Sequence, residues 1–130
     1  MVKVKFLSAI LLCLLISFSL WFFTVVEGAS PNSLAIEWLE FKVPVGEQAE
    51  FIRQDRSIWD KFLSQYPAFL GKEIWQDINN PDRLIIVARW SSYQEWKSIP
   101  DDKVKEVTDR FHRALGKEYP IISSHAFRLR

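Results

Sequence analysis

One carboxylate falls among apolar side chains on a predicted helix. Residues 47–66 carry large apolar side chains at helical spacing, and at about 100° per residue Asp55 lies about 40° from Phe51, inside the apolar arc. A carboxylate there costs several kcal/mol unless it is paired, and burial would raise its pKa toward the range of a general base. Asp55 is therefore a candidate catalytic acid or base. The alternative is that it meets solvent or pairs with an arginine such as Arg89.

A histidine provides the second candidate for proton transfer. His112 lies at the edge of the apolar stripe of a helix predicted from Pro100 to Gly116. Imidazole side chains suit proton transfer near neutral pH, or axial ligation of iron. The alternative is a histidine that only borders the core. His125 has no companion histidine or carboxylate at ligand spacing, so no metal site is expected.

Aromatic and basic side chains supply candidate ligand contacts, namely Trp59, Arg89 and Trp96. Five of the six tryptophans follow residue 30. Aromatic walls suit a flat ligand, but they suit a dimer interface or a plain core as well. Arg89 lies on one face of a predicted strand, where it would bind an anionic group, neutralise Asp55 or reach solvent along its own stem.

Several classes of chemistry are excluded by what the sequence lacks. Cys13 is the only cysteine and lies in an apolar N-terminal run, so the region after residue 30 has no thiol for catalysis, metal binding or a disulfide. The whole chain has 17 basic and 16 acidic residues, and without Lys3, Lys5 and Glu27 the region after residue 30 has 15 of each. This balance gives no excess of positive charge for binding nucleic acid. There is no phosphate-binding glycine loop and no Gly-x-Ser-x-Gly elbow.

The N-terminal segment predicts a membrane anchor or a secretion signal. Residues 6–26 form 21 uncharged positions after two lysines, and as a helix they would reach about 31 Å, the thickness of a bilayer core. We favour an uncleaved anchor over residues 1–29 with the following domain on the non-cytoplasmic side. The alternative is a signal cleaved near Ala29 or Ser30, giving a secreted or periplasmic protein. N-terminal sequencing of the mature protein separates the two.

The remaining chain predicts one α+β domain at 34–130, joined by a short polar linker at 30–33. The turn Asn79-Asn80-Pro81-Asp82 favours a hairpin, and Ser92 with Glu95 forms a capping-box pattern that begins a short helix. The predicted order is strand 34–43, helix 47–66, strands 70–78 and 83–90, a short helix from 92, helix 100–115 and strand 121–129.

This order is the βαββαβ arrangement of ferredoxin-like domains, in which both long helices cover one face of an antiparallel sheet. Residues 34–43 are apolar on both alternating faces, so the face without helices also needs a cover. Only two long helices are available. We therefore expect a homodimer.

The sequence also resembles a known family, the dimeric α/β barrel proteins that include the antibiotic biosynthesis monooxygenase-like (ABM) domains. The resemblance rests on residues 42–46 (Lys-Val-Pro-Val-Gly), on Phe69-Leu70-Gly71, and on residues 85–92 followed by Trp96, and it covers residues 34–130. It is similar in particular to short cyanobacterial proteins of this fold with an N-terminal hydrophobic segment. The resemblance implies two sheets packed face to face and a small-molecule cleft between sheet and helices in each protomer.

Relatives within this resemblance include cofactor-free, quinone-forming monooxygenases and haem-degrading enzymes. The haem-degrading branch uses an asparagine on the first strand, a tryptophan after the third and a histidine on the second long helix. Trp96 and His112 match the last two, but Leu39 stands at the asparagine position. The resemblance therefore implies no cofactor, and haem binding or degradation is disfavoured.

Together these observations predict a membrane-tethered ABM-like domain that binds a small hydrophobic or aromatic molecule. If it is an enzyme, cofactor-independent oxygenation is the expected reaction, with Asp55 or His112 taking a proton. The competing hypothesis is a non-catalytic interaction or structural module at the membrane.

Overall fold

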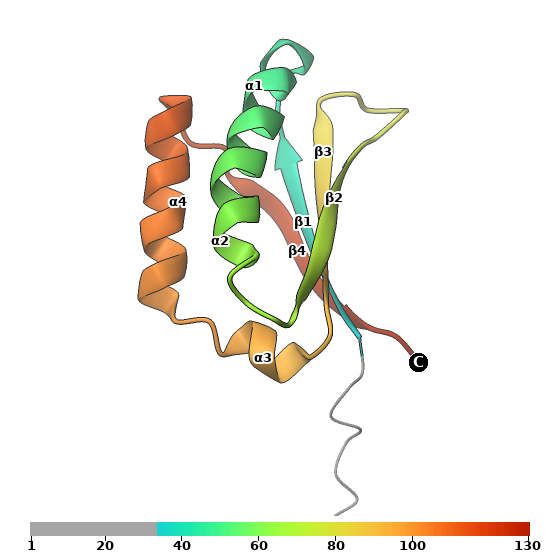
Figure 1. The fold of residues 1–130 in the computed structure, drawn as a ribbon. Helices are drawn as coiled ribbons and strands as arrows, with labels where there is room; N and C mark the ends of the chain where they lie inside the picture. Colours follow the sequence, from blue (N-terminus) through green and yellow to red (C-terminus); the bar gives the residue numbers. More distant parts are fainter. Residues whose placement is uncertain (1–33) are drawn as a thin grey trace, which may run out of the picture. The chain divides into compact units, whose positions relative to one another are not determined.

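The computed structural model describes residues 34–130, and the predicted anchor at 6–26 lies outside them. The domain contains one antiparallel sheet in the order β2-β3-β1-β4. Its strands are β1 (Ala35–Lys42), β2 (Phe69–Gln76), β3 (Arg83–Trp90) and β4 (Ile121–Arg128). The long helices cover one face of this sheet (Figure 1). The predicted ferredoxin-like α+β fold is confirmed.

The first helical segment consists of three consecutive parts, α1 (Val45–Asp55), a π-helical turn η1 (Arg56–Asp60) and α2 (Lys61–Leu63). It begins two residues earlier than predicted, because the Asp82 side chain from the hairpin loop accepts the Val45 backbone N–H at 3.1 Å. It ends at Leu63, three residues before the predicted end. The π-helical turn was not predicted.

The hairpin and the later helices follow the turn and capping signals. Asp77 Oδ1 accepts the backbone N–H groups of Asn79 and Asn80, and this local turn ends β2 two residues before the predicted boundary. Ser92 Oγ accepts the Glu95 N–H at 3.3 Å at the start of α3 (Tyr93–Lys97). Helix α4 (Asp101–Leu115) begins one residue after Pro100, which was predicted for its first turn, and ends at the predicted stop, Gly116.

Gly116 ends α4 in the left-handed region, with φ of 71°. Gly116→Ala is expected to destabilise the domain by about 1–2 kcal/mol, because a side chain is strained in that conformation. Gly46→Ala is the matched control: Gly46 lies in the first turn of α1, and nothing lies within 4 Å of an added Cβ. It should leave stability unchanged or raise it by up to about 1 kcal/mol. Chemical denaturation measures both, and equal effects of the two substitutions would refute this account of the α4 terminus.

The core lies between the helices and the sheet. Phe51 is fully buried, and its ring contacts those of Phe41, Phe111 and Tyr119 at centroid distances of 5.3–5.4 Å. These rings come from α1, β1, α4 and the loop before β4, so they fix both long helical segments over the sheet.

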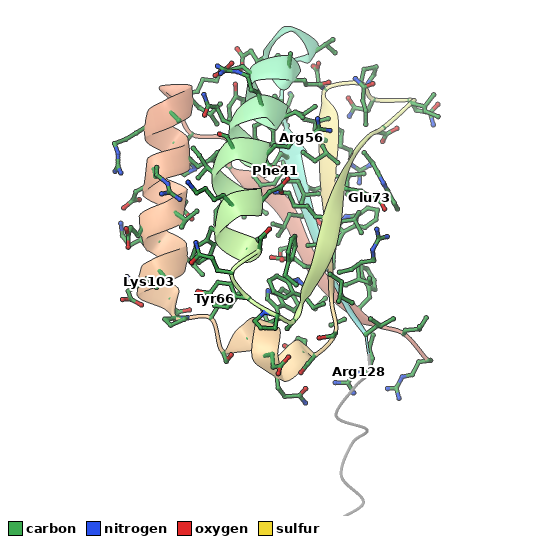
Figure 2. The ribbon with its side chains drawn as sticks, in the orientation of Figure 1. Phe41, Arg56, Tyr66, Glu73, Lys103 and Arg128 are labelled. Carbon is green, nitrogen blue, oxygen red and sulfur yellow. The ribbon has the colours of Figure 1, made fainter. Side chains whose placement is uncertain are left out.

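The opposite face of the sheet carries a second aromatic cluster, formed by Trp38, Trp75 and Phe127. The Trp38 ring meets the other two edge to face at 5.9 and 6.4 Å, and Trp75 and Phe127 are about half exposed. In Figure 2, Glu73 points away from the helices on this side, where it pairs with Arg89. The sheet is therefore apolar on both faces, as the sequence predicts.

In residues 34–130, none of the helices combines the length and the apolar character that a membrane crossing requires.

Candidate functional site

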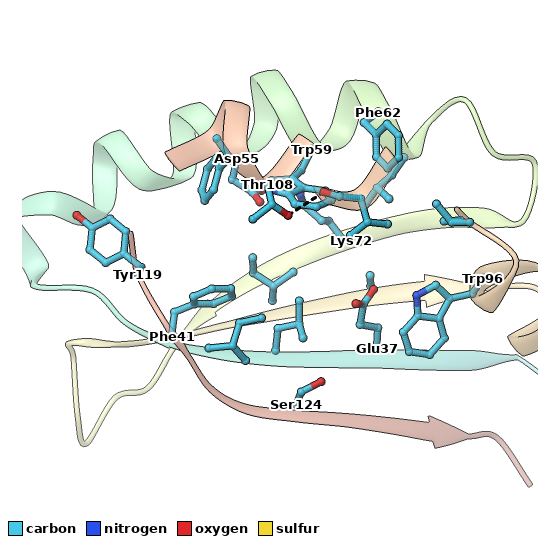
Figure 3. Close-up of a pocket in the computed structure, with 18 of the residues that line it drawn as sticks. Glu37, Phe41, Asp55, Trp59, Phe62, Lys72, Trp96, Thr108, Tyr119 and Ser124 are labelled. Atoms are coloured by element: carbon cyan, nitrogen blue, oxygen red, sulfur yellow. Dashed lines mark hydrogen bonds and ion pairs between the residues drawn. The ribbon is translucent and has the colours of Figure 1, made fainter. Parts of the chain in front are cut away.

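A pocket of about 550 Å³ lies between the helices and the sheet. Figure 3 shows Asp55, Trp59 and Phe62 on its helical side, with Glu37 and Phe41 rising from β1 opposite them. Its walls are mainly apolar and aromatic, with a few charged groups among them. This is the usual composition of a small-molecule site.

A buried ion-pair cluster lies in the wall formed by α1, η1 and β2. Lys72 Nζ lies 2.6 Å from Asp55 Oδ2 and 2.8 Å from Asp60 Oδ1. The side chains of Lys72 and Asp55 are only 4% and 1% exposed. Burial raises the pKa of Asp55, and the charge and hydrogen bonding of Lys72 act against that rise. Asp55 therefore has a cationic partner, although it is Lys72 and not the arginine considered from the sequence.

The π-helical turn explains how one lysine meets both carboxylates. In a regular α-helix, residues five apart point about 140° away from each other. A turn closed by i to i+5 hydrogen bonds brings such residues close to alignment. Asp55 immediately precedes η1 and Asp60 ends it, so the turn directs both side chains toward β2.

Glu37 is a second acidic group of the pocket. It extends from β1 on the same face as Leu39 and Phe41. Burial raises the pKa of Glu37, while the Trp90 indole N–H and the charges of Lys97 and Lys72 lower it in part. Unlike Asp55, Glu37 has no ion-pair partner among residues 34–130.

Two tryptophans form the end of the pocket near α3. The Trp90 and Trp96 rings are stacked, 5.8 Å apart and 12° from parallel. Lys97 Nζ lies 3.9 Å from the centre of the Trp96 ring, a cation–π contact that holds the ring in place. Trp59 and Phe62 meet edge to face at 6.0 Å on the helical side.

His112 lines the pocket from α4 with a side chain that is 26% exposed. Its Nδ1 lies 3.6 Å from an oxygen of Glu118, whose side chain is 79% exposed. His112 is thus accessible from the pocket and lies near a solvated carboxylate. Trp96 and Leu39 also line the pocket, but Leu39 has no polar atom, so the residue set of the haem-degrading branch is incomplete.

The structure brings four of the five predicted site residues together, since Asp55, Trp59, Trp96 and His112 all line the pocket. Arg89 does not line it. Its side chain lies on the opposite face of the sheet and pairs with Glu73 at 2.5 Å. Arg89 therefore neither contacts a ligand in this pocket nor neutralises Asp55.

Sequence reasoning missed Glu37 and Lys72. The signal for Glu37 was present, because it alternates with Leu39 and Phe41 on one face of an apolar strand. Among residues 34–130, no group of three or more histidine, cysteine or acidic side chains is arranged to hold a metal ion.

Comparison with known proteins finds a family match over residues 36–99. The family model described as antibiotic biosynthesis monooxygenase matches residues 36–99. No protein with curated function matches the chain in sequence.

Solved structures share the fold at low sequence identity. A conserved protein from Methanosarcina mazei is 18% identical, with 77% of this chain and 96% of that chain covered and a TM-score of 0.56. A candidate antibiotic biosynthesis monooxygenase from Bordetella bronchiseptica is 16% identical, with 76% and 99% covered and a TM-score of 0.59. SnoaB from Streptomyces nogalater, described as a cofactor-independent oxygenase, is 12% identical, with 76% and 94% covered and a TM-score of 0.51.

At these identities the solved structures establish the shared fold alone, and the family match adds the sequence relationship. The β1-to-α3 segment matched by the family model also contains most of the pocket's aromatic wall, including Trp59, Trp90 and Trp96. The family model therefore identifies an antibiotic biosynthesis monooxygenase domain at residues 36–99 of this chain, on a ferredoxin-like fold.

Proposed function

We propose that the domain binds a flat, mainly apolar aromatic molecule in this pocket and oxygenates it with O₂, without a cofactor. The observation that carries the proposal is the combination of aromatic walls with proton-accepting groups in one pocket of about 550 Å³. The family match over residues 36–99 supports the reaction type, and SnoaB, which has the same fold, is described as a cofactor-independent oxygenase.

The proposed chemistry uses the substrate as its own source of electrons. A pocket group removes a proton from a CH₂ group that lies between aromatic rings and is conjugated with a carbonyl. The resulting carbanion donates electrons to O₂ and becomes a hydroperoxide at that carbon. Loss of water then leaves a carbonyl, so CH₂ and O₂ become C=O and H₂O. The protein's part is to bind the ring, accept the proton and keep bulk water away.

His112 is the proton acceptor that we propose for this step. The sequence offered Asp55 and His112. A proton taken by Asp55 would weaken the buried ion pair with Lys72, whose side chain is 4% exposed. His112 reaches the pocket from α4 without such a constraint, because its side chain is not part of a buried ion pair.

Oxygen consumption with anthrone as substrate tests the proposal. The full chain, dialysed against a chelator, is expected to form anthraquinone above the spontaneous rate, with one O₂ consumed per quinone formed. A rate equal to spontaneous oxidation would contradict the oxygenase. If the arene still binds under those conditions, the result favours the non-catalytic binding module.

We also propose that two copies of the chain pair through the sheet face that carries Trp38, Trp75 and Phe127. The support is the exposed aromatic cluster on that face, since large aromatic side chains are enriched at the centres of protein interfaces. The ion pair of Arg89 with Glu73, about half exposed, lies on the same face and would fall within or beside the contact.

Trp38→Glu is expected to dissociate this dimer, because it buries an unpaired charge at the centre of the cluster. The dimer Kd should rise roughly 30-fold or more, measured by sedimentation of the full chain. Ile78→Glu is the control, since Ile78 lies in the hairpin loop and is 93% exposed. A wild-type chain that sediments as a monomer at micromolar concentration would be incompatible with the proposed pairing.

A further inference from the structure

The sheet supplies a carboxylate to the pocket that the proton transfer to His112 does not use. Glu37 rises from β1 into the pocket, opposite Asp55 and Trp59 on the helical side (Figure 3). Part of its surface stays accessible, whereas the Asp55 side chain is 1% exposed and is paired with Lys72. Among the strand residues that line the pocket, Glu37 is therefore the carboxylate that a bound molecule can reach.

The surroundings of Glu37 suit a group that accepts a proton. Burial raises the pKa of Glu37 above the usual glutamate range, which makes it a stronger base than a carboxylate in water. The Trp90 indole N–H and the charges of Lys97 and Lys72 act against that rise, so they stabilise the ionised form. Strand β1 pairs with β3 on one side and β4 on the other, which fixes the backbone that carries Glu37.

Conversion of a CH₂ group to a carbonyl requires the removal of two protons from the same carbon. In the proposed oxygenation the first proton goes to His112, and the second leaves the hydroperoxide carbon when water is lost. The two C–H bonds of a ring CH₂ point to opposite faces of the ring. On a flat molecule between the helices and the sheet, one bond therefore points toward α4, which carries His112, and the other toward β1, which carries Glu37.

We propose that Glu37 removes this second proton and so catalyses the loss of water from the hydroperoxide. The carboxylate accepts the proton of the carbon that bears the O–O group, the C–H electron pair forms the second C–O bond, and the O–O bond breaks with release of hydroxide. The hydroxide then takes the proton from Glu37, which gives water and restores the carboxylate.

This step balances within one molecule, because the carbon is oxidised while the peroxide oxygen is reduced. No O₂, cofactor or external reductant takes part. The proposal rests on the proposed function for its substrate, but it predicts a second activity that can be measured without oxygen. The domain should dehydrate a dibenzylic hydroperoxide that is supplied to it directly.

The compound 9-hydroperoxyfluorene tests the step, since its loss of water gives fluorenone. The reaction is followed under argon with the full chain, by the absorbance of fluorenone. We expect fluorenone to form faster than in buffer, and Glu37→Gln to lower kcat roughly 10²-fold with little change in KM. The substrate with deuterium at carbon 9 should react more slowly, because the C–H bond breaks in this step.

Two further variants show whether the carboxylate itself is responsible. Glu37→Asp keeps a carboxylate and should retain part of the activity that Glu37→Gln loses. Glu106→Gln is the control, since the Glu106 side chain is 69% exposed on α4 and does not line the pocket. It should keep the wild-type rate. Thermal melting checks that each variant is folded, and a loss caused by misfolding would appear as a lowered melting temperature.

Oxidation of anthrone supplies a second readout, which separates Glu37 from His112. Glu37→Gln should still consume O₂ but form anthraquinone more slowly than O₂ is consumed, with the hydroperoxide detected by its oxidation of iodide. His112→Asn should instead slow O₂ consumption and quinone formation together, and it should dehydrate 9-hydroperoxyfluorene at the wild-type rate.

The outcomes distinguish failure of this proposal from failure of the proposed oxygenase. If the full chain forms fluorenone no faster than buffer, or if Glu37→Gln matches the wild type, the role of Glu37 is wrong, whatever the result with anthrone. If the wild type dehydrates the hydroperoxide and Glu37→Gln does not, while anthrone is oxidised only at the spontaneous rate, the oxygenase is wrong and the role of Glu37 stands.

Discussion

Replacing Lys72 with methionine is expected to destabilise the domain by about 3–5 kcal/mol at neutral pH. The side chains of Lys72 and Asp55 are almost fully buried and lie 2.6 Å apart. Removal of the lysine leaves the Asp55 carboxylate buried without its cation, whereas Asp60 is 43% exposed and retains water. The loss comes from that stranded charge, since an intact buried pair contributes little net stability.

A double variant and a control separate this explanation from simple loss of packing. Asp55→Asn combined with Lys72→Met removes both charges and should recover most of the lost stability. Lys61→Met, at an exposed position of α2, should change stability by no more than about 0.5 kcal/mol. Urea denaturation measures the free energies of unfolding. A Lys72→Met variant as stable as the wild type would contradict a buried, charged pair.

The pH dependence of the Lys72→Met variant has a definite sign. Burial already raises the pKa of Asp55 in the folded chain, and loss of Lys72 raises it further. The folded state then holds its proton to higher pH than the unfolded state, so stability falls as pH rises from the unfolded aspartate pKa of about 3.9 toward the folded value. The deficit of the variant relative to the wild type should therefore shrink as pH is lowered toward 4.

Replacing His112 with asparagine should lower kcat for anthrone oxidation by roughly 10²-fold or more, which is the usual contribution of a positioned proton acceptor. The affinity for arenes should change little, because the side chain lies in the α4 wall of the pocket and is partly exposed. The loss should therefore appear in kcat and not in KM. Rates of anthraquinone formation at saturating anthrone measure it.

His125→Asn is the matched control for this prediction. His125 lies on β4 on the face of the sheet without helices, where its ring neighbours Phe127 and its Nε2 lies 2.8 Å from Ser123 Oγ. It should keep wild-type kcat. If both histidine variants lose activity equally, or if neither does, His112 is not the proton acceptor.

The fold was predictable where local chemistry decides it. Ser92 and Gly116 mark helix boundaries by capping and by a left-handed backbone, and both helices follow these signals. The alternation of apolar residues in β1 correctly indicated a sheet apolar on both faces.

The start of α1 was predicted less well, because the cap that fixes it comes from Asp82, 37 residues away. No local pattern around Val45 reports such a contact.

The site was predictable only in part. Asp55 and His112 were found because each departs from the pattern of an apolar helix face. Lys72 was missed because its partners, Asp55 and Asp60, are brought together by a π-helical turn. A regular α-helix with 100° between successive residues would direct these two side chains apart. Arg89 was placed at the site because a strand pattern does not say which face lies under the helices.

The location of a bound arene tests the central claim most directly, since the domain offers two aromatic surfaces. A crystal structure of the chain grown with anthraquinone, the product of the proposed reaction, is the measurement. We predict that the molecule lies between the helices and the sheet, with Trp59 on one side and Glu37 on the other. Anthraquinone bound instead against Trp38 and Trp75 on the opposite face, with the pocket empty, would contradict the account.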